Sequence, residues 1–135
     1  MKPSTKILGA CLLALPGLCF ALTGNELNAI MNNPALVAQG QVYIRGVLDG
    51  FQLGALSTGM QAMVDIPGKK QEEASFNLWR RTPGCFDFPT GVSFEQIFKT
   101  VTQSLNDHPE TRDADARALV INAVSSVYPC APGKP

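Results

Sequence analysis

The sequence predicts a small all-α domain, a helical bundle of about four to five helices that ends in a helical hairpin stapled by one disulfide. Apolar residues recur with the period of a helix along most of the chain. Two predicted helices begin with a capping box, at Thr23 and at Ser93. Two cysteines, Cys85 and Cys130, flank the last helical pair, and together these observations favour a stapled bundle.

The N-terminus has the pattern of a secretory signal peptide. Lys2 and Lys6 precede the apolar run Ile7–Phe20, and small residues occupy the positions needed for cleavage after Ala21. The apolar run is shorter than the roughly 20 residues that span a bilayer. We therefore predict a signal peptide at residues 1–21 and a single helical domain at residues 22–135, which is long enough for one core.

Export decides the chemistry of the cysteines and the charge of the mature chain. Cys11 and Cys19 leave with the signal peptide, so one pair remains in an oxidising compartment, where a disulfide is the default. Nine basic residues then face eleven acidic ones, so the net charge of the mature chain provides no overall basic field for nucleic acid. We expect a protein of the bacterial periplasm with no membrane attachment after cleavage.

The mature chain is predicted to open with a short helix and a long central one. The capping box at Thr23 and Glu26 predicts a helix over 24–32. Asn33 and Pro34 then predict an N-cap followed by proline at the first helical position. Apolar or small residues continue this central helix for about five turns. They are Leu36, Gly40, Tyr43, Ile44, Val47, Leu48, Phe51 and Ala55.

Glycines recur every fourth residue along the central helix, at Gly46, Gly50 and Gly54. Each lowers helix propensity by roughly 1 kcal/mol relative to alanine, so the stripe needs compensation by close packing. Polar residues interrupt the stretch and argue against a pair of membrane helices. We expect the stripe to pack inside the bundle, so that Gly46→Leu destabilises by overpacking. A homodimer through the stripe or through Phe51 explains these residues equally well.

Residues 57–92 are predicted to be the least regular part, because glycine and proline recur there. Phe76, Leu78 and Trp79 suggest a short helix that docks on the bundle. A connection of this length is either loosely ordered or used for binding. The candidate partner-binding residues form a polar tip, which comprises Lys69, Lys70, Glu72 and Glu73.

The C-terminal part predicts a helical hairpin. Ser93 and Gln96 form the second capping box, and the first helix ends near Asn106. Asp113 or Asp115 can cap the last helix, which Pro129 ends. Two apolar stripes face each other across the hairpin. They are Phe94, Ile97, Phe98, Val101 and Leu105 on the first helix, and Ala116, Leu119, Val120, Ala123, Val124 and Val127 on the second.

This hairpin brings Cys85 and Cys130 together, because the start of its first helix lies beside the end of its second. A disulfide that closes a loop of about 45 residues contributes about 4 kcal/mol to stability on the chain-entropy model. The only histidine, His108, lies at the opposite turn, about 20 Å away along a helix of about 14 residues. A nucleophilic cysteine needs its base within hydrogen-bond reach, so a Cys–His hydrolase is disfavoured.

Other chemistries find no support in the sequence. One histidine and two stapled cysteines supply neither the number nor the spacing of a zinc site. Phosphate-loop, nucleophile-elbow and dinucleotide-binding motifs are missing. Solvated surface and helix capping account for the acidic pairs at 72–73 and 113–115. We expect a protein that is not an enzyme and uses no cofactor and no metal.

The chain resembles the Rap/Tai type of periplasmic immunity protein, which protects bacteria from peptidoglycan amidases delivered by type VI secretion. The similarity lies in a cysteine, a Val-Ser-x-x-Gln helix start, a His-Pro-Glu-x-Arg turn and a closing Tyr-Pro-Cys, with a weaker match on the central helix. The matching residues with a structural part in this motif are Tyr43, Gly46, His108, Pro109, Glu110, Arg112 and Pro129. The resemblance implies a helical domain that blocks the active-site cleft of an amidase by stoichiometric binding.

One departure from the family pattern concerns the cysteines. Members often carry a second pair near the tyrosine of the central helix, whereas this chain has Gly40 nearby and no mature cysteine before Cys85. An alternative function is a small disulfide-stapled periplasmic chaperone or envelope-maintenance protein, which shares the size and the export signal. Such a chaperone would expose apolar surface on acidification, whereas an immunity protein would capture a secreted amidase at equimolar ratio.

Overall fold

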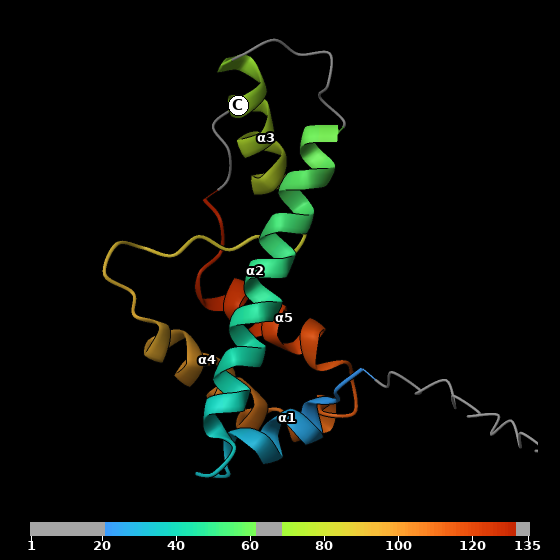
Figure 1. Cartoon of the computed structure of the whole chain (residues 1–135), viewed down its shortest axis with the longest axis vertical. Helices are drawn as coiled ribbons and strands as arrows, with labels where there is room; N and C mark the ends of the chain where they lie inside the picture. Colours follow the sequence, from blue (N-terminus) through green and yellow to red (C-terminus); the bar gives the residue numbers. More distant parts are fainter. Residues whose placement is uncertain (1–20, 62–68, 132–135) are drawn as a thin grey trace, which may run out of the picture.

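The computed structural model describes residues 21–61 and 69–131, which form five α-helices and one short 3-10 helix (Figure 1). The helices are α1 (Gly24–Met31), α2 (Val37–Gln61), α3 (Lys69–Arg81), α4 (Phe94–Asp107), η1 (Pro109–Thr111) and α5 (Ala116–Val127). These ranges contain no strand, only two isolated bridges that join Thr23 to Asp115 and Phe86 to Pro129. The predicted all-α fold is confirmed.

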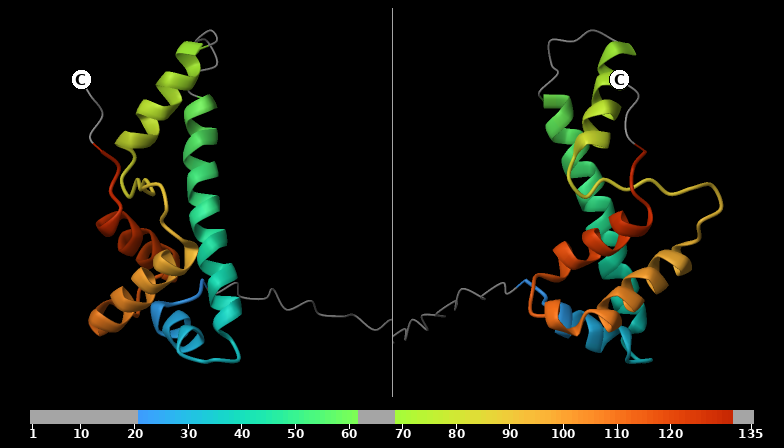
Figure 2. Two further views of the ribbon diagram at one scale, coloured as in Figure 1. Left: turned by 90° about the vertical axis from the view of Figure 1, so that its left-hand side faces the viewer. Right: turned by 180° about the vertical axis from the view of Figure 1, so that it is seen from behind.

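Helix α2 runs the length of the molecule and connects two parts (Figures 1 and 2). Helices α1, α4 and α5 pack against one another, and α1 and α5 also pack against α2. Helix α3 packs principally against α2. We call the first group, with residues 37–49 of α2, the body. Helix α3 and residues 50–61 of α2 form the distal arm, which stands away from α1 and α4 (Figure 2).

The core lies in the body. Its fully buried large side chains come from α1, α2, α4 and α5 and from the segment that connects α3 to α4. They are Leu27 of α1, Ile44 of α2, Val101 of α4, Val120 and Val124 of α5, and Phe86. Val127, expected on the inward stripe of the last helix, is instead 54% exposed, because it lies in the last turn of α5 beyond the packed region.

Both capping boxes form as predicted. At α1, the hydroxyl of Thr23 accepts from the Glu26 amide at 3.3 Å, and the Glu26 carboxylate accepts from the Thr23 amide at 2.8 Å. At α4, Ser93 and Gln96 make the same pair of bonds at 3.3 and 2.8 Å. The bonds from Thr23 hold the pKa of Glu26 below its ordinary value.

The predicted start of the central helix was wrong by three residues. The amide of Leu36 donates to the Asn33 carbonyl, a tighter turn than an α-helix, and α2 begins only at Val37. Asn33 still caps this turn, because its side chain accepts from the Ala35 amide at 3.0 Å. At the other end α2 continues past Ala55 to Gln61.

The predicted irregular segment was also wrong in its extent. Residues 57–61 complete α2, residues 69–81 form α3, and the described irregular part is confined to 82–93. Helix α3 opens with lysine, glutamine and glutamate, which are strong helix formers. Their helix propensity outweighs the glycine and proline residues that precede and follow them in the sequence. The part of the prediction at residues 62–68 lies outside the described residues.

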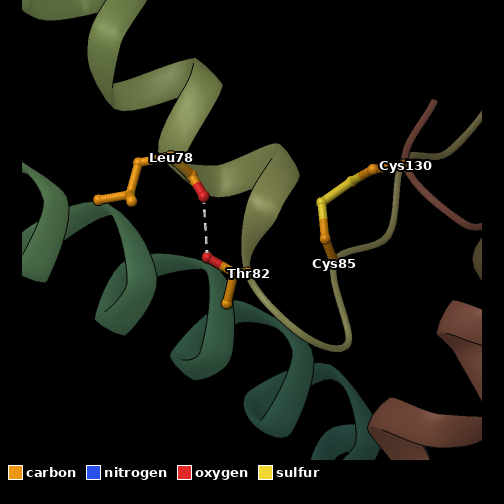
Figure 3. The surroundings of a disulfide bond; sticks show 4 residues. All are labelled: Leu78, Thr82, Cys85 and Cys130. Atoms are coloured by element: carbon orange, nitrogen blue, oxygen red, sulfur yellow. Dashed lines mark hydrogen bonds between the residues drawn. A yellow bond between two sulfur atoms is a disulfide. The ribbon is translucent and has the colours of Figure 1, made fainter. Parts of the chain in front are cut away.

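Helices α4 and α5 form the predicted hairpin, and the disulfide closes it. The Cα atoms of Cys85 and Cys130 are 5.6 Å apart, and their sulfurs are bonded (Figure 3). Backbone bonds support the staple: the Cys130 amide donates to the Cys85 carbonyl, and the Asp87 amide donates to the Tyr128 carbonyl. Between the helices, Asp115 rather than Asp113 caps α5, accepting from the Arg117 amide at 2.8 Å.

Candidate functional site

Three glycines in the middle of α2 face open space. A Cβ atom built on Gly46, Gly50 or Gly54 would meet nothing within 4 Å. The expected packing of this stripe inside the bundle was therefore wrong, and so was the expectation that Gly46→Leu overpacks the fold. The neighbouring stripe of Val47 and Phe51 packs against the core instead, which turns the glycines to solvent. We call Gly46, Gly50 and Gly54 the glycine face.

A groove of about 750 Å³ runs beside the glycine face, between α2, α5 and the segment before the disulfide. Its lining is Val42, Tyr43, Gly46, Val47, Gly50, Phe51, Pro83, Gly84, Arg117, Ala118, Ile121 and Asn122. Gly84 has a φ of 80°, and a Cβ there would come within 2.8 Å of Ile121. Glycine at this position therefore keeps both the turn and the groove wall in place.

A second groove, of about 550 Å³, continues the first along α2 toward α3. The two share Gly50 and Phe51, and the second adds Gly54, Leu78 and Thr82 to the lining. Val42 and Leu53, on the same side of α2 as the glycine face, are 74% and 68% exposed. The result is a long, largely apolar surface that is open to solvent.

One end of the first groove is polar. Arg117 donates from Nε to both carboxylate oxygens of Asp115, at 3.0 and 3.1 Å. These bonds lower the pKa of Asp115 to about 2. Tyr43 lies at the same end, and burial, reinforced by the charge of Asp115, raises its pKa. The ion pair and the phenol can orient a polar group of a bound partner.

The distal arm is anchored at one end of α3. Trp79 is buried and meets Phe51 and Phe86 edge-on, with ring centroids 5.8 and 5.6 Å apart. Thr82 closes the helix by donating from its hydroxyl to the Leu78 carbonyl at 3.0 Å (Figure 3). The predicted docking of α3 through Trp79 is therefore seen, whereas Phe76 remains 51% exposed.

The predicted polar tip forms the first turns of α3. Lys70 and Glu73 are exposed there, and the side chains of Lys69 and Glu72 lie outside the described part. One helix thus brings the four residues together at the end of α3 farther from the Trp79 anchor. Their role in binding stays a prediction.

The remaining motif residues lie at the hairpin and on α2. His108 ends α4, and its ring Nδ1 is 3.1 Å from Glu110 in the exposed helix η1 that Pro109 opens. Arg112 donates to the carbonyls of Leu105 and Asn106, the latter at 3.1 Å, and so caps the C-terminus of α4. Tyr43 and Gly46 line the first groove, and Pro129 forms the bridge to Phe86.

The described part of the chain contains no group of side chains arranged for catalysis. The two described cysteines, Cys85 and Cys130, are held in the disulfide, so neither offers a thiol. Across residues 21–61 and 69–131, no three His, Cys, Asp or Glu side chains gather into a potential metal site. None of the helices described there has the length and apolar character needed to cross a membrane. What the structure does offer is surface for binding.

Sequence reasoning missed several residues of that surface. Val42, Leu53, Arg117 and Asn122 were not singled out, and the helical period alone does not separate an outward apolar residue from an inward one. The glycine stripe could have indicated Val42 and Leu53, because they lie four and seven residues from Gly46 and so share its face of α2. Arg117 and Asn122 lie on α5, where the sequence carries no comparable signal.

No curated protein and no solved structure matches the chain. The family model of the Rap1a immunity proteins matches residues 23–130, which is more than half of the sequence. The match spans the first capping box, the glycine face, the distal arm, the hairpin and both cysteines. It confirms the resemblance drawn from the cysteine, helix-start and turn motifs. The chain therefore belongs to the Rap1a immunity protein family.

Proposed function

We propose that the chain is a periplasmic immunity protein, exported through a cleaved signal peptide at residues 1–21, that blocks a peptidoglycan amidase delivered by type VI secretion. An immunity protein acts by binding a cognate secreted effector, and family membership supports this class of activity. One structural observation favours binding over catalysis: apolar side chains are exposed on a distal arm that projects from a stapled body. The disulfide supports an oxidising compartment.

The decisive experiment combines capture with an activity assay. The mature chain, immobilised, is exposed to the secreted proteins of its host, and each captured amidase is purified and assayed on peptidoglycan. We expect inhibition that is complete at one chain per amidase and that needs no cofactor. A chaperone would instead bind an apolar dye on acidification and capture no amidase, and that result would overturn the proposal.

The polar tip of α3 is proposed as part of the contact with the amidase. Reversing its charge with Lys69→Glu and Lys70→Glu should lower the affinity at least about tenfold, because charge complementarity controls association. The matched control is Lys99→Glu, on an exposed position of α4 in the body. Equal loss in both variants would assign the effect to net charge and remove the tip from the contact.

We also propose that a second copy of the chain covers the glycine face. Phe51 needs no such explanation, because it packs on Trp79 and Phe86 within one chain. The glycines do, because their backbone is open to close approach while no part of the described chain approaches it. Gly50→Leu should therefore shift the chain toward monomer in sedimentation equilibrium. A wild-type chain that is monomeric at all concentrations would refute the dimer.

A further inference from the structure

Phe76 is unusual among the aromatic residues of this protein. It is the one aromatic side chain that is exposed in the described residues, at 51% of its surface. Most of the others take part in the chain of ring contacts from Trp79 through Phe51, Phe86 and Phe88 to Tyr128. Phe76 lies on α3, so its apolar ring projects from the distal arm rather than from the body.

Arg80 holds this ring in place. Its guanidinium carbon lies 4.5 Å above the centroid of Phe76, one helical turn away. This cation–π stack orders two side chains before any partner arrives. Aromatic residues, phenylalanine among them, and arginine are enriched in protein–protein interfaces relative to the rest of the surface.

The charge of the chain is divided between its two parts. Helix α3 carries four basic and two acidic residues, whereas the other described residues carry four basic and eight acidic ones. Within the described residues, the arm is therefore positive and the remainder is negative. An acidic partner is attracted to the arm and repelled by the body, which orients its approach.

We infer that Phe76 and Arg80 form the centre of a docking surface on α3 for a protein partner whose contact site is an apolar pocket rimmed by carboxylates. The inference rests on the proposed function, in which this partner is the secreted effector. The ring of Phe76 enters the pocket, while Arg80 and the neighbouring basic residues meet the acidic rim.

A membrane surface fits these observations less well. A basic helix that binds anionic lipid presents its large apolar side chains on one outward face. In α3 the largest apolar side chain, Trp79, points into the aromatic cluster and is buried. Phe76 and the partly exposed Leu78 remain, on opposite flanks of the buried side.

Site-specific cross-linking tests the surface even while the partner is unidentified. A photo-reactive phenylalanine analogue is placed at position 76 of the mature chain, or at position 127 as the control, since Val127 is 54% exposed but lies on the body. Each variant is irradiated with the secreted proteins of the host. We expect a cross-link to a secreted effector from position 76 alone, through a peptide flanked by Asp or Glu.

The cross-linked effector is then purified and titrated. Phe76→Ala should weaken binding at least about tenfold, and Val127→Ala less than about twofold. Arg80→Gln should slow association severalfold at low salt and have little effect at high salt, whereas Lys99→Gln should not change it. Circular dichroism verifies that each variant folds, which the exposure of these positions favours.

Each outcome decides between the two proposals. No cross-link at position 76, equal cross-links at both positions, or wild-type affinity of Phe76→Ala would overturn the docking surface even if an amidase is inhibited. A cross-linked effector that is not an amidase would support the docking surface and refute the proposed target. Binding of phosphatidylglycerol vesicles that Phe76→Ala abolishes would reassign the surface to a membrane.

Discussion

In the body, the apolar side chains of α1, α4 and α5 are buried against one another, and caps, backbone bridges and a disulfide fix the helix ends. In the distal arm, Leu53 and Phe76 are exposed and one buried tryptophan anchors α3. The residues of the body chiefly stabilise the fold. The arm carries residues that its own packing does not require, which is where binding to another molecule is to be sought.

The glycines show this difference at the level of single atoms. Gly24, at the start of α1, is buried, and a Cβ there would lie 2.9 Å from the carbonyl oxygen of Arg112. Gly50 lies in the middle of a helix, yet a Cβ there would meet nothing within 4 Å. The first glycine is required by the fold, whereas the second lowers helix stability without a described internal contact in return.

The largest effect is expected from the disulfide. Replacing both cysteines, Cys85→Ser with Cys130→Ser, should lower the free energy of unfolding by about 4 kcal/mol, because the bond closes a loop of 45 residues. Urea denaturation of the variant, compared with oxidised and reduced wild type, measures this loss. A variant as stable as the oxidised wild type would show that the body does not depend on its staple.

The next effect is at Gly24. Gly24→Ala should lower the free energy of unfolding by about 2 kcal/mol, a typical loss for overpacking, since backbone atoms of Arg112 block the new methyl group. The same urea titration measures the change. Asn25→Ala is the control for local disturbance, because it removes only the bond at 2.7 Å from the side chain of Asn25 to Asp113. A neutral Gly24→Ala would mean that α1 is not held tightly to the hairpin.

How far the sequence predicted this structure depends on whether each signal is local. The capping boxes at Thr23 and Ser93 and the apolar stripe of α4 act within one helix, and the structure confirms them. The pairing of Cys85 with Cys130 followed from hairpin topology. The direction of the glycine face could not be predicted from the sequence. It depends on which side of α2 packs against α3 and α5, and that is decided by tertiary packing.

The candidate surface was harder to predict than the fold. Tyr43 and Gly46 were singled out as motif residues, but only the structure shows that they line a groove with Arg117. The length of α3 was underestimated, because glycine and proline residues on either side drew attention away from a segment of good helix formers. The exposure of Phe76 depends on how α3 is rotated about its own axis when Trp79 is buried. The sequence of α3 alone does not determine that rotation.

A smaller effect of opposite sign is expected at the glycine face. Gly50→Ala should raise the free energy of unfolding by about 1 kcal/mol, because alanine favours the helix and its methyl group meets no described atom. The measurement requires a protein concentration at which the chain is monomeric. Compared with Gly24→Ala, it isolates the same substitution in the two parts of the molecule. If Gly50→Ala lowered the free energy of unfolding as Gly24→Ala does, the proposed difference in packing between body and arm would be wrong.

The smallest effect concerns pH and the N-terminus of α5. The pKa of Asp115 in the folded chain is about 2, below its ordinary value, because Arg117 donates to the carboxylate. The unfolded chain therefore binds this proton first, and the stabilising contribution, present above about pH 4, is lost as the pH falls toward 2. Asp115→Asn keeps a capping oxygen but removes the charge. It should be less stable than wild type at pH 7, and the difference in urea midpoint should narrow between pH 4 and pH 2. Because Asp115 lies at the surface, the change is small, and a gap that stays constant over this range would show that the pair with Arg117 contributes no stability.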